Sequence, residues 1–122
     1  SAAVDSSGDG IVMPLTNNLG QDIEVVSVKS VATECAGATS DGYAKPSKSG
    51  VWVTLTEGTT KSGKISRGQA FQVAADCPFD VEAGSKFAGQ VTVKYEVVES
   101  GFENAVTYEI RGTVKEIGTS FT

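Results

Sequence analysis

Hydrophobic and polar residues alternate most regularly near the end of the chain. Two runs, residues 88–99 and 105–115, show the period of two that is typical of a strand with one buried face. A five-residue connection joins them, so we predict an antiparallel hairpin with one solvent-exposed face. The predicted buried row is Val91, Val93, Tyr95, Val97, Val106, Tyr108, Ile110 and Val114.

The N-terminal third contains two further predicted strands. Residues 10–16 form an extended run, and Pro14 favours an edge strand or a bulge because proline cannot donate a ladder hydrogen bond. Residues 17–20 read Asn-Asn-Leu-Gly, and these residue types tolerate a positive φ. We therefore predict a hairpin turn between this strand and the next one.

The second of these strands, residues 21–31, breaks the alternation. Ile23 and Val25 share one predicted face, whereas Val26 and Val28 share the other. Two adjacent valines do not fit a single alternating row. Such a break indicates a β-bulge, or a strand that passes from one sheet to another.

Glycine, proline and small polar residues dominate the middle of the chain. Residues 32–50 are predicted to form a long surface loop, and residues 57–68 are predicted to form a turn region around three glycines. Residues 69–75 follow as a strand, with Phe71 and Val73 pointing inward.

Composition agrees with an all-β fold. Val, Ile and Thr supply 33 of the 122 residues, whereas Leu and Met supply 4, and β-branched side chains favour strands over helices. We predict an antiparallel β-sandwich of immunoglobulin-like or Greek-key type, with six to seven strands and one disulfide. The sandwich is expected over residues 10–122, and residues 1–9 are expected to be a flexible linker or the scar of a truncation.

The residue types present argue against several classes of function. Histidine is absent, which removes the commonest general base and metal ligand, and no serine nucleophile motif stands in a usable context. We therefore expect no enzymatic activity and no cofactor. The net charge of −5 is unsuited to nucleic acid or an anionic membrane surface, and no apolar run is long enough to span a membrane.

One stretch near the N-terminus resembles part of a calcium loop. Residues 5–11 place oxygen-bearing side chains at alternate positions, with glycine where the chain must turn. The twelfth position is Thr16 instead of the bidentate glutamate that such a loop requires. A flexible acidic linker explains the same residues, so no metal site is predicted.

Two aromatic residues are the candidate ligand contacts. Residues 51–56 alternate, which places Trp52 on the face opposite the aliphatic residues, and Tyr43 lies in the preceding predicted loop. Aromatic faces bind ligands such as carbohydrate, whereas the alternative is a tryptophan that closes one side of a sandwich core. The aliphatic row of this run is Val51, Val53 and Leu55.

The chain has two cysteines, Cys35 and Cys77. An even pair in a small β-rich chain predicts one disulfide, and the alternative is two buried free thiols. Neither belongs to a Cys-x-x-Cys motif, so a structural zinc site is not expected. A disulfide implies an oxidising compartment outside the cytoplasm, and any export signal would then have been removed from this sequence.

Several short motifs stand in a definite order along the chain. Residues 17–23 read Asn-Asn-Leu-Gly-Gln-Asp-Ile, Thr-Glu precedes Cys35, and Ser-Arg-Gly-Gln at residues 66–69 leads into the strand before Cys77. Later motifs are Gly-Ser-Lys-Phe-Ala-Gly at residues 84–89 and Ile-Arg-Gly at residues 110–112. Over nearly the whole chain this arrangement resembles the globular β domain of archaeal type IV pilin-like proteins, which include archaellum-related subunits.

The resemblance implies a surface domain of a filament subunit. In that family a hydrophobic N-terminal helix, exposed by a prepilin peptidase, bundles with the helices of other pilin subunits, and the β domain covers the outside. The helix is missing from this chain. The implied role is therefore filament assembly and adhesion at the extracellular cell surface, with other subunits and S-layer components as partners. The alternative is a secreted or envelope-anchored ligand-binding β-sandwich that binds S-layer protein or glycans.

We predict that Cys35 and Cys77 are joined. The bond would close a 43-residue loop, which stabilises a fold by about 4 kcal/mol in the chain-entropy model. Reduction should lower the melting temperature by about 10 °C or more. Mass spectrometry after alkylation without reduction is the direct check, and labelling of both thiols would contradict the pairing.

Overall fold

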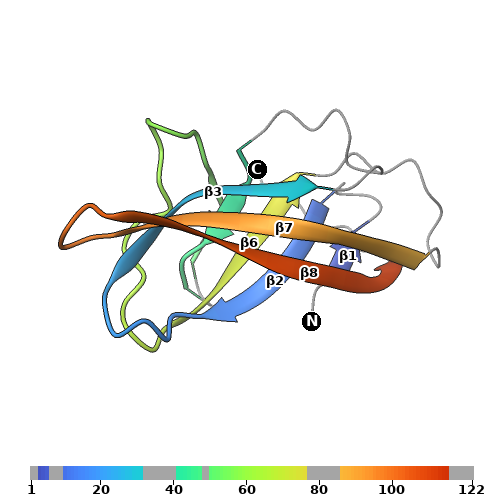
Figure 1. Cartoon of the computed structure of the whole chain (residues 1–122), viewed down its shortest axis with the longest axis horizontal. Helices are drawn as coiled ribbons and strands as arrows, with labels where there is room; N and C mark the ends of the chain where they lie inside the picture. The colour runs from blue at the N-terminus through green and yellow to red at the C-terminus, as the bar shows by residue number, and fades with distance from the viewer. Residues whose placement is uncertain (1–2, 6–9, 32–40, 48–49, 77–85, 116–122) are drawn as a thin grey trace.

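A computed structural model of the chain shows eight β-strands in the residues that it describes (Figure 1). It describes residues 3–5, 10–31, 41–47, 50–76 and 86–115, and contains no helix in those ranges, hence none that is long and apolar enough to cross a membrane. The strands are β1 (Ala3–Asp5), β2 (Gly10–Thr16), β3 (Ile23–Val31), β4 (Tyr43–Lys45), β5 (Val53–Thr54), β6 (Ala70–Asp76), β7 (Lys86–Val97) and β8 (Glu103–Lys115).

The strands form two antiparallel sheets that are linked by one short strand. The order is β3-β7-β8-β1-β2-β6-β4-β5, so three strands lie on one side of β1 and four on the other. Strand β1 pairs in parallel with β8 and antiparallel with β2. It lies in the segment for which the sequence predicted a linker, and it raises the number of strands above the six or seven expected.

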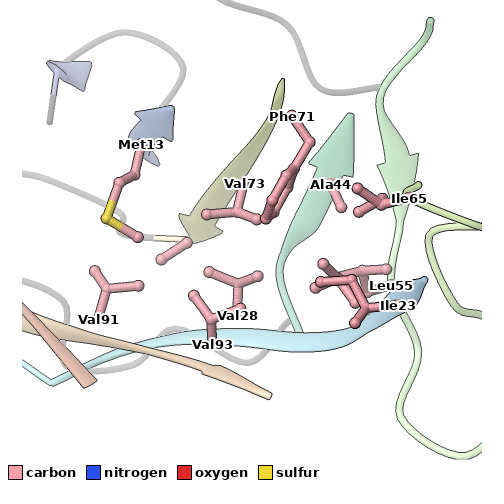
Figure 2. Close-up of a cluster of buried hydrophobic side chains, with 12 residues drawn as sticks. Met13, Ile23, Val28, Ala44, Leu55, Ile65, Phe71, Val73, Val91 and Val93 are labelled. Carbon is pink, nitrogen blue, oxygen red and sulfur yellow. The ribbon is translucent and has the colours of Figure 1, made fainter. Parts of the chain in front are cut away.

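One cluster of buried hydrophobic side chains receives residues from both sheets (Figure 2). Val25, Val28 and Val91 come from the three-stranded sheet, and Val73 comes from the four-stranded sheet. All four are at most 1% exposed. The other members are Met13, Ile23, Ala44, Leu55, Ile65, Phe71, Ala75 and Val93. The predicted inward positions of Phe71 and Val73 are confirmed.

A β-bulge in β3 decides which of its valines reach this cluster. The register against β7 shifts between Val25 and Ser27, so the predicted bulge is confirmed at Val26. The extra residue reverses the alternation that follows it. Val28 therefore joins Val25 in the core, and the prediction that these two residues lie on opposite faces is wrong.

The predicted C-terminal hairpin is confirmed, with β7 and β8 antiparallel over 11 residue pairs. Val91, Val93 and Val97 are buried as expected. Val106 is 38% exposed, so its assignment to the buried row is wrong. The side chains of Ile110 and Val114 lie outside the part of the chain whose side chains are described.

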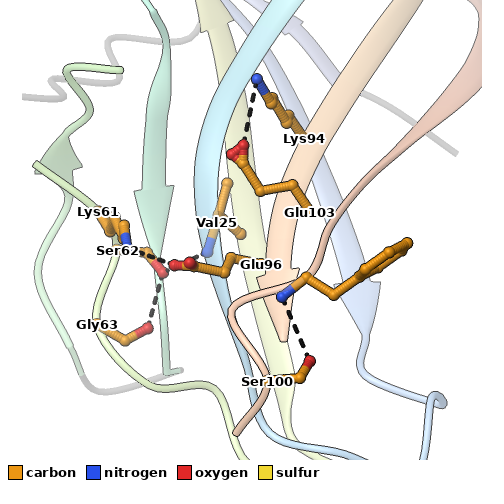
Figure 3. A network of polar contacts seen from close by, with 9 residues as sticks. Val25, Lys61, Ser62, Gly63, Lys94, Glu96, Ser100 and Glu103 are labelled. Atoms are coloured by element: carbon orange, nitrogen blue, oxygen red, sulfur yellow. Dashed lines mark hydrogen bonds and ion pairs between the residues drawn. The ribbon is translucent and has the colours of Figure 1, made fainter. Parts of the chain in front are cut away.

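The outer face of the hairpin is polar, as predicted. The hydroxyls of Thr92 and Thr107 lie 3.0 Å apart across the two strands. Lys94 Nζ lies 3.5 Å from a carboxylate oxygen of Glu103 (Figure 3). Exposed pairs of this kind contribute little to stability, and they mark this face as the one that meets solvent.

Residues 17–20 do not form the predicted hairpin turn. Strand β2 pairs with β1 and β6 and not with β3, so this segment carries the chain from one sheet to the other. The side chain of Asn17 is buried, and its amide nitrogen donates to the main-chain oxygens of Gln21, Ile65 and Ser66 at 2.8, 3.1 and 3.2 Å. Asn17 thus connects residues 17–20, which pass between the sheets, to the segment that contains Ile65 and Ser66.

The predicted loop over residues 32–50 contains a strand. Strand β4 inserts between β5 and β6, and Gly42, just before it, has a φ of 90°. A Cβ atom there would stand 2.3 Å from the main-chain oxygen of Val28, so only glycine fits. The alternating run over residues 51–56 contains only the short strand β5, and of its predicted aliphatic row Leu55 is buried whereas Val51 is 76% exposed.

The outer edge of β3 is covered by the segment between β5 and β6. Ile23 and Ile65 exchange two backbone hydrogen bonds, of 3.0 and 2.7 Å. Ser62 donates its backbone N–H to the oxygen of Val25 at 3.0 Å, and its hydroxyl accepts from the N–H of Val25 at 2.9 Å (Figure 3). The edge of one sheet is thereby closed by a segment of the other.

Replacing Val73 by alanine should destabilise the chain by about 2 kcal/mol, because a buried cavity would be left between the sheets. Val73 is completely buried, whereas Val51 is 76% exposed and provides the matched control. Val51→Ala should change the free energy of unfolding by less than about 0.5 kcal/mol. Urea denaturation measures both values, and equal costs would contradict the core described here.

Candidate functional site

The two sheets separate on the side where β2 and β8 face each other. Strand β1 joins these strands only at one end, where Ala3, Val4 and Asp5 pair with residues 10–12 of β2. On the other side Val4 and Asp5 pair with residues 114–115 of β8. Beyond this link, β2 and β8 run on toward the left of Figure 1 with no described strand between them.

An apolar groove lies in this gap. Its inner part has a volume of about 220 Å³ and is bounded by Leu15 on β2, by Val106 and Tyr108 on β8, and by Phe71 and Tyr95 deeper inside. Residues 16–19 form one end of it. We call this feature the β2–β8 groove.

A larger and more polar hollow of about 660 Å³ shares Leu15, Phe71 and Tyr108 with the β2–β8 groove. Its lining also includes Lys45 and Gln72, together with other hydroxyl and amide groups. The groove and the adjoining hollow together present apolar and polar lining groups, which is the usual composition of a binding site.

Burial changes the pKa of one side chain in the groove, that of Tyr108. Partial burial raises the pKa of the Tyr108 phenol above its ordinary value of 10.0, and the nearby charge of Tyr95 adds to the effect. Tyr108 is therefore a neutral hydroxyl at physiological pH, able both to donate and to accept a hydrogen bond.

The two aromatic residues predicted to contact a ligand lie away from this groove. Tyr43 is on β4, directly opposite Thr54 of β5, and Trp52 precedes β5 by one residue. The β4–β5 pair thus brings both residues to one edge of the four-stranded sheet. Each side chain is half-buried and already interacts within the protein.

In the described part of the chain, the other residues singled out from the sequence form no site. Cys35 and Cys77 lie outside the described residues, so their predicted disulfide stays a prediction. Among the described residues, no group of three or more Asp, Glu or Cys side chains could hold a metal ion. Three residues of the calcium-like stretch, Asp5, Gly10 and Ile11, are paired as parts of β1 and β2, and residues 6–9 lie outside the described residues.

Comparison of the chain with protein-family models, with curated proteins and with solved structures finds no match. The site therefore has to be interpreted from its own geometry.

Sequence reasoning missed the β2–β8 groove. Val106 and Tyr108 were assigned to a buried row because they alternate with polar residues, and alternation does not reveal where two sheets diverge. The available signal was Pro14, which marked β2 as an edge. An edge strand that also carries alternate apolar residues is the pattern that points to an open groove.

The phenol of Tyr108 should titrate above the ordinary tyrosine pKa of 10.0. Tyr108→Phe should remove the late phenol from an ultraviolet pH titration, whereas Tyr43→Phe should leave it in place. Because the folded state holds this proton more tightly than the unfolded state, stability should fall as the pH rises above 10.0, more steeply in the parent chain than in Tyr108→Phe. A late phenol that persists in Tyr108→Phe would contradict the assignment.

Proposed function

We propose that this chain is the surface domain of an archaeal type IV pilus-like filament subunit, with its two sheets packed as an immunoglobulin-like Greek-key β-sandwich. The cluster of buried side chains shared by the two sheets supports the sandwich. The order of motifs that resembles the pilin-like group supports the family. Filament assembly and adhesion at the extracellular surface are then its role, and a Cys35–Cys77 disulfide suits that compartment.

The observation that carries the proposal is the attachment of β1. This first strand is paired on both sides, in parallel with β8 and antiparallel with β2. A force from a preceding helix would act along β1. The hydrogen bonds that join β1 to β2 and to β8 are perpendicular to this force, so they bear it together. A domain carried on the outside of a filament needs such an attachment.

Cohesion of the filament comes from the preceding helix in this proposal. About 20 apolar residues packed against neighbouring helices bury enough surface to hold subunits together, at roughly 25 cal/mol per Å². The exposed face of the β7–β8 hairpin, with Lys94, Glu103 and two threonines, remains in solvent. Filament assembly therefore requires no catalytic groups in the domain.

A ligand-binding role is the second candidate, and one observation favours it. Strands β4 and β5 bring Tyr43 and Trp52 to the same sheet edge, as a contact for glycans or S-layer protein requires. Trp52→Ala should weaken binding to such a surface, whereas Val51→Ala, at an exposed neighbouring position, should not.

The filament proposal is tested by expressing the full-length gene in its host. Antibodies raised against this domain should label surface filaments along their length. Charged substitutions in the apolar helix should abolish the filaments and leave the domain folded, because the helix provides the cohesion. A matched control is Phe102→Glu, at a 64% exposed site in the β7–β8 turn, which should preserve them. Filaments that survive the helix substitutions, or a gene with a cleaved secretory signal and no retained helix, would favour the ligand-binding role.

A further inference from the structure

We propose that the β2–β8 groove binds an extended, alternately apolar peptide segment of a partner chain as an added β-strand. The inference goes beyond the filament proposal and does not depend on it. It rests on two strand edges that face each other, on the apolar floor between them, and on β1, which already occupies the far end of the same gap.

The edge of β8 offers backbone groups to the gap. Val97 donates its N–H to the oxygen of Phe102 at 2.9 Å, so these two residues form a hydrogen-bonded pair of the β7–β8 ladder. Because hydrogen-bonded pairs alternate in an antiparallel ladder, Ala105, Thr107 and Glu109 direct their N–H and C=O groups away from β7. Among the described residues, β8 finds a second neighbour only at residues 114–115.

The edge of β2 also offers backbone hydrogen-bonding groups to the gap, but fewer than the edge of β8. Asn17 donates its N–H to the oxygen of Gln69 at 3.0 Å, on the side of β6. By the same alternation, Pro14 and Thr16 face the gap. Pro14 offers only its carbonyl, which limits indiscriminate strand pairing without closing the edge.

Strand β1 sets the direction of the occupant. It runs antiparallel to β2 and parallel to β8, so an added strand that continues its line would run parallel to β8 and meet β2 only at Thr16, which the same register places opposite Glu109. The occupant would take up part of the gap that β1 leaves unfilled, alongside residues 105–109 of β8. This continuity favours a peptide strand over a compact small molecule.

The floor of the groove sets the side-chain pattern of the occupant. Leu15, Phe71, Tyr95, Val106 and Tyr108 line the inner side, so every second residue of the added strand must be apolar. The intervening residues point outward, beside Thr16 and Thr107, and can be polar. Val106, which is 38% exposed in the free chain, would become buried on binding.

The test uses the 122-residue chain and labelled heptapeptides. The probe is Thr-Val-Thr-Val-Thr-Val-Thr, with Ile and Leu versions in place of Val, and the control is each peptide methylated on its backbone nitrogens. Fluorescence anisotropy should show at least one alternating peptide binding about tenfold more tightly than its methylated control, because methylation removes the strand hydrogen bonds. Amide shifts of Ala105, Thr107 and Thr16 should change on binding.

Matched variants locate the binding in the groove. Val106→Arg should weaken binding about tenfold or more by placing a charge on the apolar floor. Val98→Arg changes a similarly exposed valine outside the groove and should leave affinity within about twofold. Unchanged melting temperatures show that both variants fold. Equal affinity of methylated and unmethylated peptides, no binding by any of the three probes, or indifference to Val106→Arg would overturn the proposal.

Discussion

Two backbone hydrogen bonds between Ile23 and Ile65 hold the sheets together along one side. Ile23 belongs to β3, the edge of the three-stranded sheet, whereas Ile65 lies between β5 and β6 of the other sheet. Both side chains are buried in the common core. Asn17 donates to the same carbonyl of Ile65 at 3.1 Å, so the crossing after β2 is fixed to this contact as well. With the β3 edge closed here, the cluster between the sheets is shielded from water on that side.

Within the described part of the chain, the opposite side of the molecule is closed only at one end. There β1 is the sole described strand between β8 and β2, and it is three residues long. The difference between the two sides explains why Val28 on the β3 side is 1% exposed while Val106 on the β8 side is 38% exposed. The same difference connects fold and function. A firmly attached first strand suits a domain that is carried on a filament, and the edge of β8 at residues 105–109 leaves room for a strand from another chain.

Local pattern predicted the strands well and their assembly poorly. The β7–β8 hairpin, the β6 strand and the bulge in β3 all follow from alternation and its interruption, which depend on neighbouring residues. Whether Val106 is buried depends on how far β2 lies from β8, which no local pattern contains. Asn17 illustrates the same limit, because its residue type signalled a turn, whereas its buried amide bonds to residues 48 and 49 positions away. The sequence shows a glycine at position 42, but it does not show that the backbone at this position lies against Val28.

Amide hydrogen exchange in the free chain tests this account of one closed and one open side most directly. The N–H groups of Ile23, Val25 and Ile65, which bond across the closed side, should exchange only through global unfolding. Those of Ala105, Thr107 and Glu109, on the open side, should exchange close to the rate of an unprotected peptide. Deep protection of these three amides would show that the edge of β8 is already covered. Rapid exchange at Ile65 would show that its contact with Ile23 does not hold the sheets together.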